Sequence, residues 1–388
     1  MNFKQERINF IVHSPLVPVV NGIRSTATNL ILELNKICDL HVILILGSNN
    51  LPNDETFLFL RKNNVRFSEV VANAEKSAFF EKLKVLFPYH LKAEQNVAKK
   101  ISLLCGNDKA IYFGTSFDPV AYPLAKELKV PFFFPADSIT LFEKNKKVSG
   151  ILRLIIKKIK IYIASRIENR IHFSNFQKIF YVSSNDIECS QFYSNSGKSA
   201  LCRIGVQKPS LFKSYKLGTN RNLIFTGVMN FGPNEDAALY IIDELLPYSK
   251  NTFNVKIVGM NPTSAIKQRA NNNVIVTGAV ADISELLITS DIFVSPLFSG
   301  AGAKNKVIQS LAVGLIVVGS TDSFSGFDTL PPGAYIADSV QEFVDVINSL
   351  LILSPLELQS ISDSAVDYIC QNYLWSASAE TLLKSLSE

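Results

Sequence analysis

The fold is decided by the stretch LIFTGVMNFGPNEDAA, which runs from Leu223 to Ala238. An apolar run of strand length ends at Gly227, and a helical pattern follows Gly232, with Asn234 as its expected N-cap. The two glycines bracket Asn230 at the strand tip, a feature that helix capping alone does not explain. The stretch predicts a strand, a tight turn and a helix, which is the repeating unit of parallel α/β sheets.

The same unit recurs along the whole chain. The expected strands are Ile8–Val12, Leu40–Leu46, Arg66–Val71, Ala110–Gly114, Val130–Phe134, Ile179–Ser183, Asn222–Thr226, Val255–Gly259, Val274–Thr277, Asp291–Ser295, Leu315–Gly319 and Ala334–Ala337. Several are apolar on both faces, as buried parallel strands are. The alternation lapses between residues 205 and 222. We therefore expect two doubly wound domains, 1–205 and 206–370, a ligand cleft between them, and a final helix over 371–388 that returns to the N-terminal domain.

Composition sets the class of protein. Of the 388 residues, 47% are hydrophobic and 19% are charged, which excludes a disordered chain. No uncharged apolar run approaches the ~18–20 residues of a membrane-spanning helix, and the first residues lack a cleavable signal pattern. The five cysteines are widely spaced, with no C-x-x-C pair, so we expect buried thiols and no metal site. Because neither a membrane-spanning run nor a signal pattern is found, we expect the chain to be cytoplasmic. Its net charge is +5.

A glycine-rich segment, SGAGAKNKVIQSLAVG, covers Ser299 to Gly314 and follows an expected strand. At ~100° per residue its apolar positions share one arc, and Lys306 and Gln309 lie on the opposite arc. Cations in a first helical turn oppose the helix dipole, so an anion such as a diphosphate bound nearby accounts for them. The alternative is a glycine-rich turn with solvated lysines.

The loop after the first strand is a second candidate anion site. Gly22 and Arg24 precede a helix whose expected N-cap is Ser25, so backbone amides and a fixed charge meet at its start. The alternative is a turn in which the glycine only relieves strain. No G-x-G-x-x-G follows the opening strand of either half, and no Walker A lysine motif occurs, which argues against NAD, FAD and P-loop nucleotides.

Five segments together carry a resemblance. They are NGIR (Asn21–Arg24), FTGVMN (Phe225–Asn230) with the following PNEDA, VTGAVADI (Val276–Ile283), the glycine-rich segment (Gly300–Gly314) and YLWS (Tyr373–Ser376). With them the chain resembles, over nearly its full length, the family-4 (group 1) glycosyltransferases of the GT-B fold. The resemblance implies an α/β architecture of two Rossmann-like domains, and transfer of a sugar with retention from a nucleotide diphosphate sugar. It implies no cofactor and no metal.

The resemblance also implies the residues of the donor site. The expected donor-binding residues are Gly22, Arg24, Gly227, Asn230, Gly278, Val280, Ser299, Gly300, Gly302, Lys304, Lys306 and Gln309. In this family, lysine and arginine in place of a metal neutralise the leaving diphosphate. The N-terminal domain usually holds the acceptor.

Two departures from the family pattern concern the chemistry. The family commonly has glutamate where this chain has Gln309, and many relatives have a histidine near the donor sugar, whereas the segment GTSFD, which ends at Asp118, has none. We therefore name no catalytic base. His13, Asp118 and Asp137 are candidates to contact the acceptor, and a packed histidine and loop-capping aspartates are the alternatives.

The segment from Lys144 to Arg170 concentrates positive charge. Arg153, Lys157 and Lys160 form one helical stripe, and isoleucines form another. Such a helix is typical of segments attracted to anionic membrane surfaces. The alternative is an ordinary helix whose isoleucines pack on the sheet. No nucleic-acid motif occurs, so we expect no nucleic-acid partner.

We therefore expect a cytoplasmic glycosyltransferase, peripheral at the inner face of the cell membrane. Its partners would be a nucleotide sugar and a glycan or lipid-linked acceptor in cell-surface polysaccharide synthesis. One alternative is a non-catalytic GT-B-like scaffold or regulatory subunit, in which Gln309 marks relaxed donor binding. A sugar-nucleotide epimerase of similar fold is another, against which the lack of an acid/base pair argues.

Overall fold

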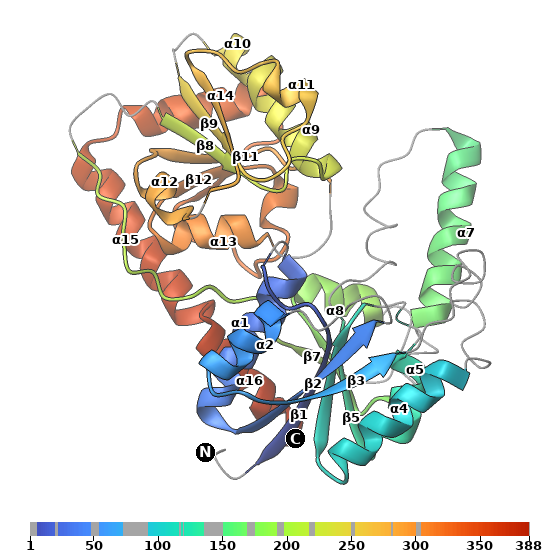
Figure 1. Cartoon of the computed structure of the whole chain (residues 1–388). Helices are drawn as coiled ribbons and strands as arrows, with labels where there is room; N and C mark the ends of the chain where they lie inside the picture. The colour runs from blue at the N-terminus through green and yellow to red at the C-terminus, as the bar shows by residue number, and fades with distance from the viewer. Residues whose placement is uncertain are drawn as a thin grey trace. The chain divides into compact units, whose positions relative to one another are not determined.

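The computed structural model describes residues 6–19, 22–47, 54–72, 92–115, 118, 120–135, 150–168, 175–191, 198–216, 222–249, 253–280, 282–299 and 304–387. The chain divides into two compact units (Figure 1). Unit 1 comprises Met1–Arg203 with Trp375–Glu388, and unit 2 comprises Ile204–Leu374. The sequence-based boundaries at 205/206 and 370/371 lie within a few residues of this division.

Unit 1 is built on a parallel sheet of seven strands in the order β3-β2-β1-β4-β5-β6-β7. The strands are β1 (Arg7–His13), β2 (Asp39–Gly47), β3 (Arg66–Ala72), β4 (Lys109–Gly114), β5 (Val130–Pro135), β6 (Lys178–Tyr181) and β7 (Ser199–Leu201). Winding reverses between β1 and β4. In doubly wound sheets, ligands bind beyond the carboxyl ends of the strands at such a reversal.

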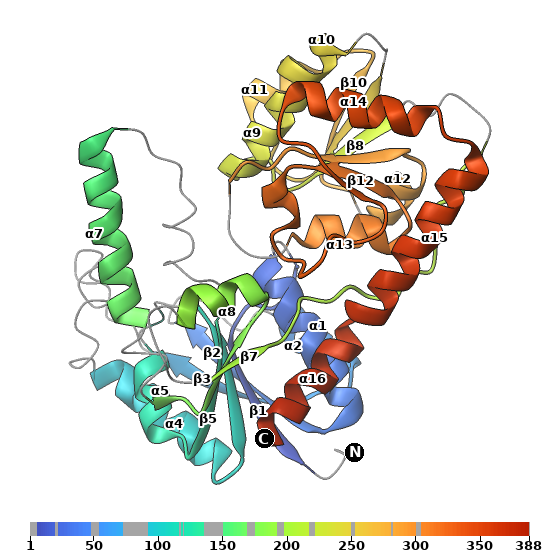
Figure 2. The ribbon, with the colours of Figure 1, turned by 180° about the vertical axis from the view of Figure 1, so that it is seen from behind.

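Helices complete unit 1. They are α1 (Gly22–Ile37), α2 (Asp54–Lys62), α4 (Lys92–Cys105), α5 (Ala121–Glu127), α7 (Ile151–Glu168), α8 (Ser184–Gln191) and α16 (Trp375–Ser387). The C-terminal α16 packs against α1 (Figure 2). Its side chains Trp375, Leu382 and Leu383 are buried. The core between sheet and helices is strongly aromatic: Tyr112 and Phe133 stack with ring centroids 5.5 Å apart.

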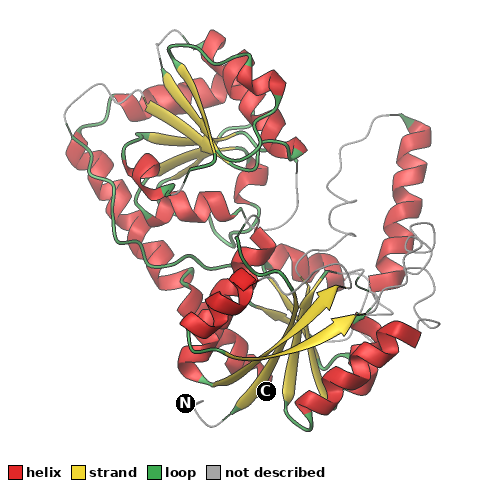
Figure 3. Cartoon of the chain, in the orientation of Figure 1, coloured by secondary structure: helices red, strands yellow, loops and turns green. Residues whose placement is uncertain are grey.

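Unit 2 is built on a parallel sheet of six strands in the order β10-β9-β8-β11-β12-β13, so its winding reverses between β8 and β11. The strands are β8 (Asn222–Thr226), β9 (Asn254–Val258), β10 (Val274–Gly278), β11 (Ile292–Ser295), β12 (Ile316–Gly319) and β13 (Ala334–Ile336). The helices are α9 (Gly232–Tyr240), α10 (Leu246–Tyr248), α11 (Ser264–Lys267), α12 (Ser284–Ile288), α13 (Asn305–Ala312), α14 (Val340–Leu351) and α15 (Pro355–Asn372), and a π-helical turn (Ile241–Leu245) joins α9 to α10. Figure 3 shows helices on both faces of each sheet.

The twelve strands expected from the sequence are all present, most with ends within a residue of the expected ones, and the two-domain α/β fold is confirmed. The sequence missed the short edge strand β7. Two predicted caps are wrong. Helix α1 already begins at Gly22, so Ser25 lies inside it. The N-cap of α9 is Phe231, and Asn234 lies in the first turn because the helix begins at Gly232.

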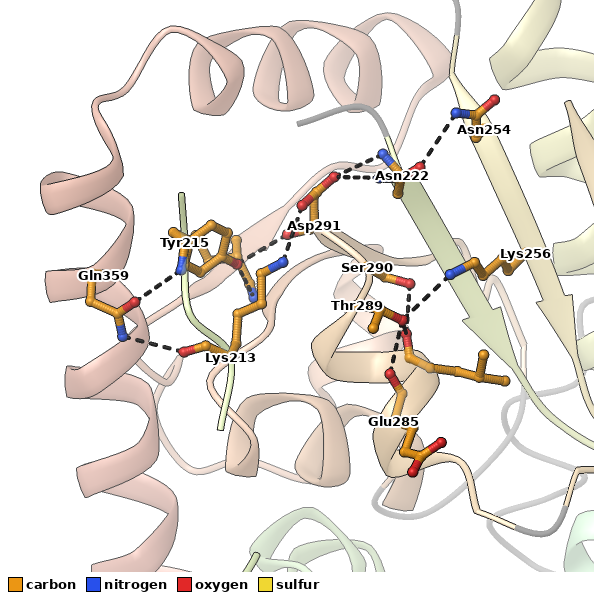
Figure 4. Close-up of polar contacts among 12 residues, drawn as sticks. Lys213, Tyr215, Asn222, Asn254, Lys256, Glu285, Thr289, Ser290, Asp291 and Gln359 are labelled. Carbon is orange, nitrogen blue, oxygen red and sulfur yellow. Dashed lines mark hydrogen bonds and ion pairs between the residues drawn. The ribbon is translucent and has the colours of Figure 1, made fainter. Parts of the chain in front are cut away.

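A buried polar network fastens residues 204–216 to unit 2 at the amino end of the sheet (Figure 4). The Lys213 ammonium lies 3.1 Å from Oδ1 of Asp291, and both side chains are at most 10% exposed. Oδ2 of the same carboxylate accepts hydrogen bonds from the backbone and side-chain nitrogens of Asn222, at 3.0 and 3.1 Å. The Tyr215 hydroxyl donates to the Asp291 carbonyl and accepts from the Ile316 amide. The buried Asp291 carboxylate therefore has a cation and two further hydrogen-bond donors around it, which offset the cost of its burial.

In the described part of the chain, no single helix has the length and apolar character needed to cross a membrane. Helices Val340–Leu351 and Pro355–Asn372 are long and apolar enough when taken together, but the chain bends by 114° between them. Both helices bury apolar side chains in the core of unit 2.

Candidate functional site

The carboxyl edge of the unit 2 sheet presents backbone where three neighbouring strands end. The Gly227 amide donates to the Val258 carbonyl and the Gly259 amide to the Gly278 carbonyl, each at 3.0 Å. A Cβ on Gly259 would lie 1.7 Å from the Gly227 carbonyl oxygen, and its φ of +147° is one that side chains rarely adopt. Only glycine fits there, because the two strand ends pack backbone against backbone.

Lys306 lies beside this edge in the first turn of α13. Its ammonium donates to Oδ1 of Asn234 at 2.5 Å and sits 4.5 Å from the ring centroid of Phe225. Nδ2 of Asn234 donates in turn to the Val228 carbonyl, at 3.0 Å. A Cβ on Gly227 would lie 2.7 Å from Asn234 Nδ2 and 3.0 Å from Lys306 Nζ, so the bare glycine makes room for both side chains.

No carboxylate balances the charge of Lys306 in the part of unit 2 that the structure describes. Burial, with a smaller contribution from the Lys304 cation, lowers the pKa of Lys306 to about 7. Within the described residues, its polar contact is the neutral Asn234, and no carboxylate pairs with it. An ammonium at a helix N-terminus and beside bare backbone suits an anionic ligand, since the anion would offset the cost of burying the charge.

The other expected donor residues of unit 2 lie around this edge. Lys304 is the N-cap of α13, Asn230 is exposed in the turn after β8, and Val280 is exposed just beyond β10. Gln309 is exposed on α13, whereas the Lys306 head group turns inward, so the two do not share the solvent-facing arc that the periodicity indicated. Ser299 is half-buried. Gly300 and Gly302 lie outside the described residues.

Gly22 and Arg24 belong to unit 1. Both lie in the first turn of α1, and Nη1 of Arg24 donates to the Pro18 carbonyl at 3.1 Å. Their expected role towards the donor stays a prediction.

A second cluster lies at the carboxyl edge of the unit 1 sheet, where winding reverses. Nε2 of His13, at the end of β1, is 2.6 Å from Oδ2 of Asp118 and 3.3 Å from the Tyr112 hydroxyl of β4. Oδ1 of Asp118 accepts from the Val120 amide at 3.0 Å. The carboxylate is 11% exposed and the imidazole 41%, so the pair reaches the surface through the histidine. A Cβ on Gly114 would lie 2.5 Å from the Tyr112 phenol, which explains the glycine.

Electrostatics define the protonation of this cluster. Burial disfavours the charged forms of both partners, but their mutual attraction and hydrogen bonds outweigh it. The pKa of His13 is therefore raised above 6.5 and the pKa of Asp118 is lowered. Burial and the nearby carboxylate raise the pKa of Tyr112 well above 10, so its phenol stays protonated and donates to Asp118.

Sequence reasoning named His13 and Asp118 separately, and the structure brings them together. The sequence did not identify Tyr112, Asn234 as a partner of Lys306, or Gly259. Asp137, the third acceptor candidate, lies outside the described residues.

The expectation of buried thiols holds for three described cysteines, whereas Cys370 is half-buried. Cys38, Cys105 and Cys202 are free, and burial raises the pKa of each to about 12. Over the described residues, no group of three or more His, Cys, Asp or Glu side chains is placed to hold a metal ion.

Comparisons with known proteins agree with this architecture. Residues 220–352 match the family model described as glycosyl transferases group 1. No curated protein matches the chain. Among solved structures, HepE of Anabaena in complex with UDP and glucose is 12% identical, with a TM-score of 0.69 over 98% of this chain and 99% of that one.

Two further solved structures have the same fold. TarM is 11% identical, with a TM-score of 0.70 over 100% of both chains. A sucrose-phosphate synthase of Thermosynechococcus elongatus is 13% identical, with a TM-score of 0.70 over 98% of both chains. At these identities the likeness is one of fold. The chain thus has the GT-B fold, and its residues 220–352 match the model of the group 1 glycosyltransferases.

Proposed function

We propose that the chain transfers a sugar, with retention, from a nucleotide diphosphate sugar to a hydroxyl of a glycan or lipid-linked acceptor. The observation that carries the proposal is the Lys306 ammonium. It lies within the residues that match the family, in the first turn of α13, and has no carboxylate partner among the described residues.

Unit 2 would bind the donor. At Gly278, where nothing lies within 4 Å of the position of a Cβ, the backbone would let a flat group approach closely. Lys306 would sit against the diphosphate, with Asn234 holding the ammonium in place. As the bond between the anomeric carbon and phosphate oxygen breaks, negative charge grows on the leaving diphosphate, and a fixed cation there stabilises the transition state. The structures of HepE with UDP and with UDP-glucose support a nucleotide sugar as the donor class.

Unit 1 would bind the acceptor. The Asp118 carboxylate, held by His13, Tyr112 and the Val120 amide, is oriented to accept a hydrogen bond from an acceptor hydroxyl. We assign it positioning of that hydroxyl rather than removal of its proton, since a carboxylate with a lowered pKa is a weak base. The hydroxyl proton would pass to the leaving diphosphate, so no base from the protein is required.

The second candidate function is a non-catalytic scaffold of a glycan-synthesis complex. It is favoured by Gln309, where relatives commonly have a glutamate. A glutamine donates and accepts hydrogen bonds to ribose hydroxyls but lacks the strength of a charged partner.

A donor screen tests both proposals. Calorimetry with UDP, GDP and dTDP sugars should give binding of one of them, followed by product detection by mass with glycan and lipid-linked acceptors. Binding with product formation supports the transferase. Binding of none of the three would favour the scaffold, and a changed sugar without any acceptor would indicate an epimerase.

A further inference from the structure

Helix α7 (Ile151–Glu168) is an exposed helix in unit 1. In Figures 1 and 2 it stands away from the sheet. Its burial is confined to Ala164 and Ser165 near its C-terminal end, among the positions whose side chains the structure describes. The sequence left open whether its isoleucines pack on the sheet, and in the structure Ile151, Ile155, Ile156, Ile159 and Ile163 are exposed instead.

The exposed apolar side chains of α7 form one face. Each is between 42 and 80% exposed. At ~100° per residue, seven of them fall within an arc of about 140°, the width of an amphipathic face. They are Ile151, Leu152, Ile155, Ile156, Ile159, Tyr162 and Ile163. A water-exposed surface of this kind marks an interaction site, because burying it elsewhere releases free energy.

The charges of α7 indicate what covers that face. Arg153, Lys157 and Lys160 lie on the arc beside the apolar one, and Lys158 and Arg166 add two more cations. Glu168 is the one acidic residue in the helix. A second copy of the chain would bring like charges together along the contact, whereas an anionic surface would pair with all of them.

We propose that α7 lies in the interface of a bilayer containing anionic lipid, with its isoleucines among the upper acyl chains and its lysines and arginines at the headgroups. Apolar insertion and electrostatic attraction act together in such helices. Lipid binding by α7 is independent of the proposed glycosyl transfer, because none of the residues assigned to the donor or the acceptor belongs to this helix.

Vesicle flotation of the full chain tests this contact. The chain should bind vesicles of phosphatidylcholine with phosphatidylglycerol about tenfold more tightly, or better, than vesicles of phosphatidylcholine alone, and added salt should weaken the binding. Equal binding to both kinds of vesicle, or to neither, would overturn the proposal.

Two pairs of variants locate the contact. I155S/I159S and K157E/K160E should each lower binding to anionic vesicles about tenfold or more. The matched controls lie on exposed positions of α4: L103S removes an 84% exposed apolar side chain, and K99E/K100E makes the same charge change. If the controls lose as much binding as the α7 variants, α7 is not the contact.

Two further measurements distinguish lipid binding from donor binding and from self-association. UDP affinity by calorimetry should be unchanged in the α7 variants, so failure of donor binding and failure of membrane binding are told apart. Sedimentation without lipid reports self-association. A dimer that I155S/I159S abolishes would show that a second copy covers α7, and would overturn the lipid assignment.

Discussion

In unit 1 the carboxyl edge of the sheet carries an imidazole and a carboxylate 2.6 Å apart, whereas in unit 2 the same edge carries the ammonium of Lys306 against an amide and an aromatic ring. Both clusters lie at the reversal of a doubly wound sheet. The first is neutralised from within, whereas the second has no carboxylate partner among the described residues. The difference fits the proposed function, in which unit 1 would bind a neutral hydroxyl compound and unit 2 an anion.

The two edges also differ in what they expose. At the carboxyl edge of unit 1 the exposed groups are side chains. At the carboxyl edge of unit 2 the exposed group is glycine backbone. The substitution with the largest expected effect on this contrast is Gly259→Ala, in unit 2. The new methyl would meet the Gly227 carbonyl at 1.7 Å, in a backbone conformation that is strained for alanine. We expect a loss of about 3 kcal/mol or more in the free energy of unfolding, measured by denaturant titration.

Gly232→Ala is the control for this change. A Cβ at Gly232 meets nothing within 4 Å, and unfolding should shift by no more than about 0.5 kcal/mol. Equal destabilisation by both alanines would mean that the backbone contact is not what constrains the edge.

Asp118→Asn would break the unit 1 side. The change keeps the shape but removes the charge that holds the His13 proton, so burial should bring the pKa of His13 below 6.5. Turnover should fall about 100-fold while UDP affinity stays constant, because the acceptor hydroxyl loses its charged partner. Steady-state kinetics and a histidine NMR titration provide the two readouts.

The pH dependence of that pair has a definite sign. His13 has a raised pKa, so its contribution to stability is full below about 6.5 and is lost as pH rises through the folded value. The D118N protein should lack this loss. If its stability follows pH as the parent's does, the ion pair is not responsible.

Lys306→Met would break the unit 2 side. Removal of a charged donor from the diphosphate should weaken UDP binding about 30-fold with folding intact. In the parent, UDP affinity should fall as pH rises from about 7 towards 9, because Lys306 with a pKa of about 7 loses its proton there. The methionine protein should show no such fall. Calorimetry over this pH range compares them, and unchanged affinity in the variant would remove Lys306 from the site.

Gln309→Glu should have the smallest effect and would sharpen the comparison between catalyst and scaffold. The side chain is exposed on α13, so folding should tolerate the carboxylate. UDP affinity should stay within about threefold or improve if the position contacts ribose hydroxyls. Complete loss of binding would show that the glutamine has another role.

The sequence predicted the strands well because a parallel strand buried on both faces is an apolar run. The edge strand β7 has three half-buried residues and includes a serine, so it left no such run. The Asn234 cap was wrong because Gly232 and Pro233 both fit a first helical turn, and propensity alone does not decide where the helix starts.

Side-chain partners required three-dimensional information. Periodicity placed Lys306 on an outward arc, but its long side chain reaches back over Phe225. His13 and Asp118 are far apart in the sequence and come into contact because β1 lies beside β4. The need for glycine at position 259 arises from a contact between two loops, which no local pattern contains.

The buried pair of Lys213 and Asp291 has a consequence for dissecting the protein. The family match begins at residue 220, so a domain excised there would lack Lys213 and Tyr215. Asp291 would then keep its buried position without a cation, at a cost of about 3–5 kcal/mol. The segment that matches the family model is therefore shorter than the unit that packs together, and a fragment of the C-terminal unit should begin at Ile204.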